Sequence, residues 1–144
     1  MSFYPCRGGG TKKPYYVGVE GATNNSSGGF YTKYYLDISD VNAIELIGYS
    51  GTHYAGGGLK DITVIIYGSS NTLDTNIMSS VELANLRSKL YTTKISSKSY
   101  AGKDINPTNP IKLALPTSYK SVCIGVEIPD YNFNGNVFFK VYPR

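Results

Sequence analysis

The amino-acid sequence predicts an all-β protein: an antiparallel β-sandwich of the jelly-roll type, with at most one short helix. Several short segments alternate apolar and other residues with a period of two, which gives each strand one apolar face. Glycine, asparagine, serine and proline separate these segments at regular intervals, as the turns of a sandwich do. The long helical crossovers that parallel strands need are absent from the pattern, so we expect antiparallel sheets.

Composition agrees with one such domain. The chain has 144 residues, of which 17% are charged, 16 are glycine and 14 are tyrosine. This length suffices for a single core, and small polar residues suit short strands joined by turns. The net charge of +4 permits weak attraction to anionic surfaces but demands no specific nucleic-acid partner.

The first 29 residues differ from the rest, since they hold seven glycines and two prolines. We predict a flexible or extended N-terminal arm over 1–29, with one short strand near 15–20, and a β-sandwich domain over 30–144. The start of the chain lacks an apolar leader, so we expect no signal peptide, no membrane insertion and assembly in the cytoplasm.

Two strands are expected next, over 30–38 and 43–49, with a turn at 40–42 between them. Residues 48–58 are so rich in glycine that we expect a mobile loop there. The segment 61–67 is apolar on both faces, which predicts a strand at the centre of a sheet.

A short helix is expected over 80–89. Ser79 and Glu82 have the spacing of a capping box, and leucines follow at helical intervals. The alternative is that this region already runs into a strand over 91–97. Beyond it we expect a rigid turn at 106–110 and a short strand over 111–115.

The last 23 residues predict a β-hairpin. Alternating apolar residues occupy 122–128 and 137–141, and Asn134-Gly135 supplies the positive φ angles of a tight turn. The same stretch, from Asp130 through Asn132 to Gly135, also has the oxygen-ligand spacing of a calcium loop. However, Val141 stands where that loop needs a bidentate glutamate, so we favour a plain turn and no cofactor.

Other chemistry is less well supported. Asp37 and Asp40 have the spacing of a metal pair, but aspartates that cap a turn explain them better. We expect no disulfide framework from Cys6 and Cys123, because one falls in the predicted arm and the other in a strand pattern. The single histidine, His53, lies in the predicted glycine-rich loop. No pattern in the sequence predicts that it lies beside a nucleophile, or that two carboxylates lie close enough for glycoside hydrolysis. We therefore predict that the protein is not an enzyme.

Five basic residues occur from residue 87 to residue 103 with no acidic residue among them. We interpret them as a solvated face, with a phosphate-binding stripe as the alternative. They are Arg87, Lys89, Lys94, Lys98 and Lys103.

Tyrosine carries the remaining functional signal, because its ring packs on sugar rings and protein surfaces while its hydroxyl makes hydrogen bonds. Several tyrosines fall in predicted loops, where they would be available to a ligand. The predicted ligand-binding residues are Tyr49, His53, Tyr54, Asn132 and Asn134.

The chain also resembles a known group of proteins. Its start, Tyr4-Pro-Cys-Arg-Gly-Gly-Gly10, is similar to leaders of small structural proteins of tailed bacteriophages and prophages. Residues 35–40, 62–67 and 138–142 resemble the jelly-roll domains of phage fibres, baseplates and head fibres. The resemblance implies an N-terminal arm that attaches to other virion proteins, a homo-oligomer that is often a trimer, and a surface that binds host glycans.

Our hypothesis from the sequence is therefore a non-enzymatic, virion-associated attachment module that binds a cell-surface carbohydrate. One alternative is a purely structural decoration or oligomerisation protein of a phage particle. Another is a secreted lectin or carbohydrate-binding module.

Overall fold

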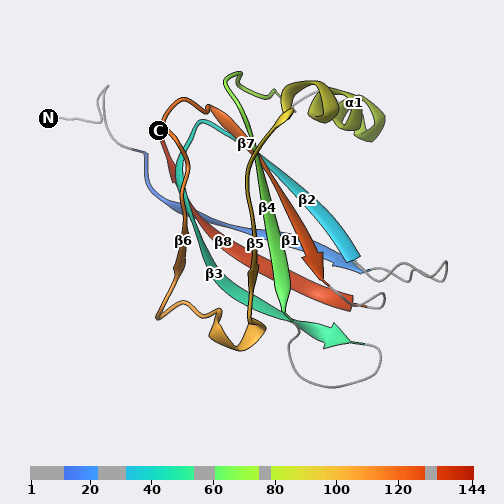
Figure 1. Ribbon diagram of the computed structural model, residues 1–144, viewed down its shortest axis with the longest axis vertical. Coiled ribbons are helices and arrows are strands. Elements are labelled where there is room, and N and C mark those ends of the chain that lie inside the picture. The colour runs from blue at the N-terminus through green and yellow to red at the C-terminus, as the bar shows by residue number, and fades with distance from the viewer. Residues whose placement is uncertain (1–11, 23–31, 54–60, 75–78, 129–132) are drawn as a thin grey trace, which may run out of the picture.

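The structure is a β-sandwich of two four-stranded antiparallel sheets with one short α-helix (Figure 1). It is a computed structural model that describes residues 12–22, 32–53, 61–74, 79–128 and 133–144. The predicted all-β sandwich with one helix is confirmed.

Eight strands build the two sheets, and the pairs of neighbouring strands within each sheet are antiparallel. The first sheet has the order β1 (Tyr15–Ala22), β8 (Phe133–Pro143), β3 (Val41–His53), β6 (Ile111–Leu113). The second has the order β2 (Thr32–Ser39), β7 (Ser121–Ile128), β4 (Ile62–Ser69), β5 (Thr93–Tyr100). The helices are α1 (Ser80–Leu90) and the 3₁₀ turn η1 (Gly102–Asp104).

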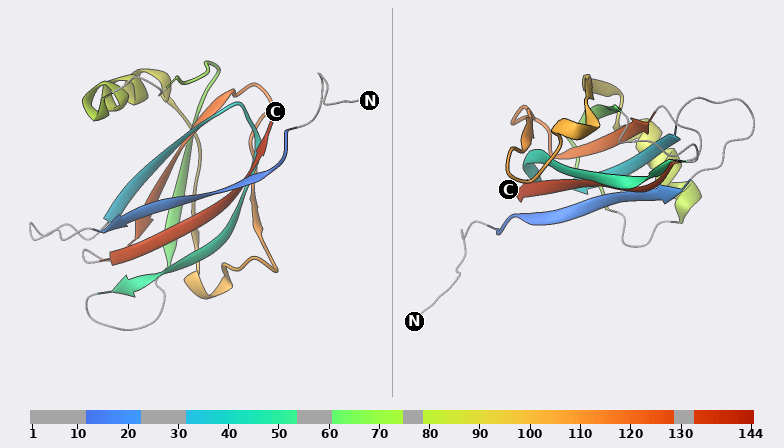
Figure 2. Two further views of the ribbon diagram at one scale, coloured as in Figure 1. Left: turned by 180° about the vertical axis from the view of Figure 1, so that it is seen from behind. Right: turned by 90° about the horizontal axis from the view of Figure 1, so that it is seen from below.

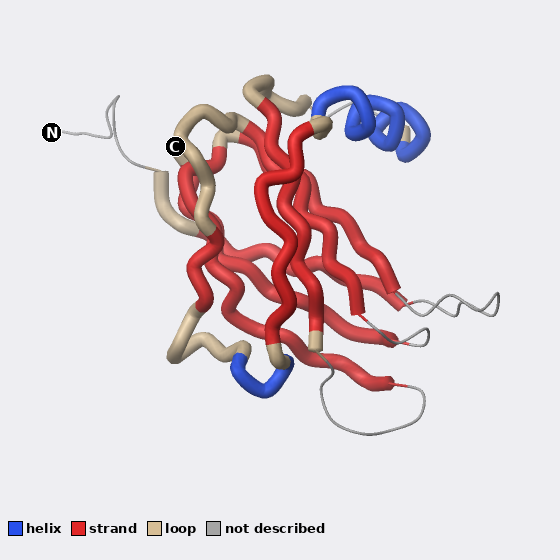
Figure 3. The backbone as a smooth tube through the Cα atoms, in the orientation of Figure 1, coloured by secondary structure: helices blue, strands red, loops and turns tan. Residues whose placement is uncertain are grey.

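The strand pairing is nested. β1 pairs with β8, β2 with β7, β3 with β6 and β4 with β5, as if one long hairpin had been folded over. Two further pairings, β3 with β8 and β4 with β7, close each sheet. Helix α1 belongs to the connection between β4 and β5, at the tip of this nested arrangement (Figure 3).

The C-terminal hairpin prediction is wrong in its pairing. Both strands exist, but β7 pairs with β2 and β4, whereas β8 pairs with β1 and β3 in the other sheet. Asn134 and Gly135 are not turn residues, because they lie in β8 opposite Ala22 and Gly21. Period-two alternation shows which face of a strand is apolar, and both sheets of a sandwich share one core, so alternation cannot choose the partner.

The core lies between the inner faces of the two sheets. Alternate residues of each long strand point into it, and β4 is an interior strand flanked by β7 and β5, as its sequence predicts. The largest fully buried side chains are Phe139, Ile44, Leu46, Ile62, Ile66, Ile124, Val41, Val64, Val122 and Val126.

The predicted turn between the second and third strands is a single residue. Asp40 has a φ of 54°, which carries the chain from β2 in one sheet directly into β3 in the other. Aspartate tolerates this left-handed conformation better than most residues. Its backbone N–H donates to the carbonyl of Lys120, and its carbonyl accepts from the N–H of Arg144.

Two boundaries differ from prediction. Residues 48–53, expected in a mobile loop, continue β3 to His53, because their backbone pairs with β8 as far as Phe133. The strand expected near 15–20 is present as β1, and it pairs with β8 along its length, so it forms part of the sandwich. The rest of the predicted arm, 1–11 and 23–29, lies outside the described residues.

Candidate ligand-binding site beneath helix α1

Helix α1 lies against the outer face of the second sheet, near the ends of β2, β7 and β4 (Figures 1 and 2). The predicted capping box starts it: Ser79 Oγ accepts from the N–H of Glu82, and Glu82 accepts from the N–H of Ser79. Its leucines pack on a small apolar cluster outside the main core. This cluster contains Leu73, Tyr91 and Cys123, with Tyr67, Leu83, Leu86 and Leu90 packed against it.

The chain that leads toward the helix is held on the sheet by hydrogen bonds. Leu73 donates its N–H to the hydroxyls of Ser39 and Ser121, and its carbonyl accepts from Ser39. These serines belong to β2 and β7. Buried backbone groups are thus satisfied by side chains where strand pairing has ended.

An ion pair fixes the helix to β2. Arg87 Nε lies 3.2 Å from both carboxylate oxygens of Asp37, and Nη2 lies 2.6 Å from Oδ2. The Asp37 side chain is only 6% exposed and that of Arg87 25% exposed. The hydrogen bonds to Asp37 raise the pKa of Arg87, so the guanidinium stays charged. The guanidinium also lies 5.3 Å from the centre of the Tyr35 ring.

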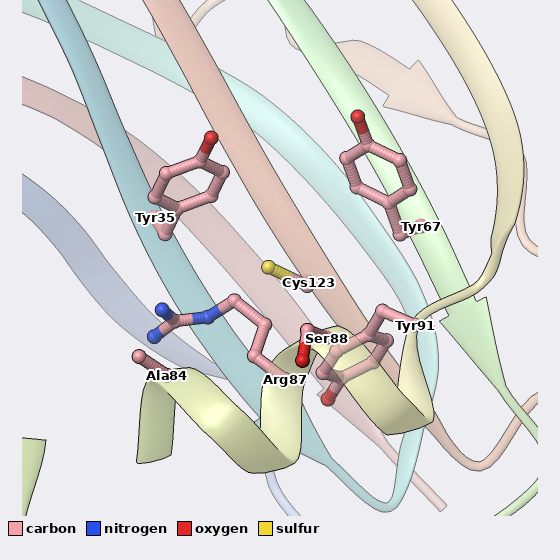
Figure 4. Close-up of a pocket in the computed structure, with 7 residues that line it drawn as sticks. All are labelled: Tyr35, Tyr67, Ala84, Arg87, Ser88, Tyr91 and Cys123. Carbon is pink, nitrogen blue, oxygen red and sulfur yellow. The ribbon is translucent and has the colours of Figure 1, made fainter. Parts of the chain in front are cut away.

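Between the helix and the sheet is a cavity of about 380 Å³. Neighbouring positions on adjacent strands bring Asp37, Cys123 and Tyr67 side by side. In Figure 4, Tyr35 and Tyr67 stand on the two strands that flank β7, with Cys123 between them and α1 closing one side. The cavity is lined by Tyr35, Tyr67, Ala84, Arg87, Ser88, Tyr91 and Cys123.

A smaller hollow of about 40 Å³ continues along β7 from the cavity, and Tyr35 and Tyr67 line both spaces. Gly125 lies on its floor. A Cβ at this position would be 3.3 Å from Cε1 of Tyr35, so the glycine makes room for the tyrosine ring over β7. Glu127 lines the far end of the hollow.

The thiol in the cavity is unsuited to nucleophilic chemistry. Cys123 is fully buried, and burial, together with the charge of Asp37, raises its pKa to about 12. It is therefore protonated at neutral pH, whereas a reactive cysteine needs a lowered pKa. Burial likewise raises the pKa of Tyr91, whose hydroxyl makes no hydrogen bond with the described residues. The cavity can therefore bind a ligand through its enclosed space, its aromatic rings and its hydrogen-bonding groups.

Of the predicted ligand-binding residues, Tyr49 lies in a strand and not in the loop expected for it. Tyr49 is 5% exposed and belongs to the main core, because β3 extends through it. His53 is paired with Phe133, and Asn134 with Thr52, near the ends of the paired strands β3 and β8. Only the backbones of these residues are described. Tyr54 and Asn132 lie outside the described residues. Their role in binding stays a prediction, which the burial of Tyr49 disfavours for that residue.

The cavity residues escaped sequence analysis because they come from three strands and a helix. Asp37 was assigned to a turn, although it lies in β2, and Arg87 to a solvated basic stretch. The sequence carried no clear signal for this cavity, because a charged residue such as Asp37 on the outer face of a strand is also what an exposed face carries.

Neither metal sites nor membrane spans are found among the described residues. No three histidine, cysteine or acidic side chains gather there to hold an ion. Within the same ranges, no helix has the length and apolar character needed to cross a membrane.

Comparison of the chain with models of protein families, with curated proteins and with solved structures finds no match. The resemblance to phage jelly-roll proteins therefore stays a prediction.

Proposed function

We propose that the protein is a non-enzymatic binding module that holds a neutral sugar ring in the cavity between α1 and the second sheet. The observation that carries this proposal is the pair of tyrosines, Tyr35 and Tyr67, on either side of a space of about 380 Å³. A volume of this size is within the usual range of small-ligand sites. Aromatic rings offer flat apolar surfaces to the C–H groups of a sugar, and their hydroxyls make hydrogen bonds.

The charges of the cavity support a neutral ligand. Asp37 and Arg87 neutralise each other, and Cys123 and Tyr91 are uncharged at neutral pH. A charged ligand would have to compete with the buried ion pair for its partner. A sugar hydroxyl can instead share the outer N–H groups of Arg87 and the hydroxyl of Ser88 without breaking that pair.

A glycan array followed by titration in solution tests the site. We expect a neutral saccharide to bind, and Tyr35→Ala and Tyr67→Ala each to weaken the affinity by about tenfold, as the loss of an aromatic contact worth about 1.4 kcal/mol implies. Tyr16→Ala, an exposed tyrosine on the other sheet, is the matched control. An array without binding, or affinity unchanged in both cavity variants, would refute the proposal.

The loop prediction provides a rival within the same experiment. If Tyr54→Ala or Asn132→Ala abolishes binding while Tyr35→Ala does not, the ligand site lies in the loops and the cavity proposal fails. The two sets of variants therefore separate the rival sites in one titration series.

We further propose that the module acts on a virus particle as an attachment protein and that its sandwich is a jelly roll. The strand orders β1-β8-β3-β6 and β2-β7-β4-β5 support the second part, since a jelly roll is an eight-stranded double sheet made of two Greek keys. The first part rests on the resemblance of the N-terminal residues and the strands. Mass spectrometry of phage particles purified from cells that express the chain should detect it. Its absence from those particles would refute the virion assignment.

A further inference from the structure

The outer face of the first sheet carries an unusual row of side chains. Four residues at matched positions cross β1, β8, β3 and β6 side by side: Tyr16, Lys140, Glu45 and Lys112. All four point outward, since their neighbours along each strand, such as Val17, Leu46 and Val141, pack into the core. Among the described residues, no helix or strand covers this face, whereas α1 covers part of the opposite one (Figure 2).

The adjacent row has an aromatic residue between two glycines. Phe138 in β8 lies opposite Gly18 in β1 and Gly48 in β3. Cβ atoms at the two glycines would lie 3.6 Å and 3.3 Å from atoms of the Phe138 ring. The ring therefore lies over both glycines, with no side chain beside it at either position, and Phe138 is 37% exposed. The result is a flat apolar patch on this face.

We propose that this face binds the same face of a second copy of the chain, about a twofold axis that runs along the strands between β8 and β3. Such an axis brings β8 of each copy over β3 of the other. Lys140 then meets Glu45 of the second copy, and the Phe138 rings of the two copies, each lying over its own Gly48, meet near the axis. At the edges, Tyr16 meets Lys112. The contacts of Lys140 with Glu45 and of Tyr16 with Lys112 each occur twice.

Charge complementarity selects this occupant. The row alternates as lysine, glutamate and lysine, so its reversed copy supplies the opposite charge at both central positions. Glu45 already accepts a hydrogen bond from the hydroxyl of Tyr142, and Lys140 lies 5.2 Å from the centre of the Tyr142 ring, which orders both groups before association. Two twisted sheets can stack face to face about 10 Å apart.

Analytical ultracentrifugation of the full chain measures the association. We expect a species of twice 15.7 kDa that dissociates on dilution. Glu45→Lys and Lys140→Glu should each raise the dissociation constant by about 100-fold, because each places two like-charged pairs in the interface. The double variant Glu45→Lys/Lys140→Glu restores opposite charges and should bring the constant back to within about tenfold of the original.

Two further variants keep the test decisive if a charge reversal disturbs folding. Phe138→Ala removes the exposed ring without altering charge and should also weaken the dimer by about tenfold or more. Lys98→Glu, an exposed change on β5 of the other sheet, is the matched control and should leave the constant unchanged. Circular dichroism confirms that each variant is folded.

Three results would overturn the proposal. The chain could remain monomeric at every concentration tested, or form a dimer that Glu45→Lys and Phe138→Ala leave intact. It could also bind a saccharide as a monomer and lose that binding in Phe138→Ala, which would assign this face to carbohydrate.

Discussion

The side chain of Asp37 joins the two parts of the candidate site. It lies in β2 with only 6% of its side chain exposed, and its partner Arg87 comes from a helix 50 residues later in the chain. Burying a lone carboxylate is costly, so each partner depends on the other. The pair also holds Arg87 against the ring of Tyr35.

Removal of the arginine should therefore destabilise the fold. Arg87→Ala leaves Asp37 buried without its cation, and we expect the free energy of unfolding to fall by about 2–4 kcal/mol, somewhat less than for a fully buried pair because Arg87 is partly exposed. Urea titration measures the loss. Lys89→Ala on the exposed side of the same helix is the control and should change little; an equal loss in both variants would contradict the structural role of the pair.

Alkaline pH should destabilise the protein through Cys123. Burial raises the pKa of this thiol to about 12, whereas a cysteine in the unfolded chain titrates near 8.5. Above that pH the unfolded state loses a proton that the folded state keeps, so stability decreases as pH rises. The slope is about 1.4 kcal/mol per pH unit for one group.

Urea titrations at pH 7, 9, 10 and 11 measure this slope. Cys123→Ala should flatten it between pH 9 and 10, and Tyr91→Phe should reduce the further loss above pH 10, because the pKa of Tyr91 is raised as well. If both variants keep the slope of the unaltered protein, other titratable groups determine how the free energy of unfolding depends on pH.

At the scale of single elements, β8 illustrates how alternation separates two roles. Phe139 is fully buried in the core, while the preceding Phe138 lies on the outer face. Phe139→Ala should lower the free energy of unfolding by about 3–5 kcal/mol, because it leaves a cavity.

Phe138→Ala is the matched variant for that measurement. We expect a loss of less than about 1 kcal/mol at a dilution where the chain is monomeric, since little buried surface is removed. Comparable losses in the two variants would mean that the strand is rotated from the described arrangement.

Helix α1 depends on its first turn. Ser79→Ala removes the side chain that accepts from the N–H of Glu82, and we expect a loss of about 1 kcal/mol in the free energy of unfolding by urea titration. Ser88→Ala, in the last turn of the helix, should leave stability unchanged or slightly higher because alanine favours helix. The reverse order of the two effects would argue against the cap.

Elements were predicted better than their partners. The helix was recognised because a capping box is a local signal, and β4 because a strand apolar on both faces must be interior. The pairing of β7 and β8 was missed because it depends on which sheet each strand joins. The cavity beneath α1 was missed for the same reason, since Asp37 and Arg87 meet only through the folded chain.

At the scale of the whole molecule, the nested pairing determines how far apart in sequence the contacts are. β1 pairs with β8 from the other end of the chain, and β2 with β7. Strands that pair with distant partners fold slowly, because the chain loses conformational entropy in closing a long loop before the stabilising contacts form.

We therefore expect refolding over milliseconds to seconds, in the range of other β-sandwiches. Stopped-flow tyrosine fluorescence suits the measurement, since the chain has 14 tyrosines and no tryptophan. Refolding in microseconds would contradict the dominance of distant pairings.

The position of α1 in the connection between β4 and β5 separates one wall of the cavity from the strand pairing. That connection closes the nested pairing at its tip, so the other strand pairs do not depend on its length. The side of the helix that faces the sheet is fixed, because Arg87 pairs with the buried Asp37 and the leucines pack on the apolar cluster. The exposed positions that line the cavity, Ala84 and Ser88, can therefore be varied to change its shape while the register of the eight strands is preserved.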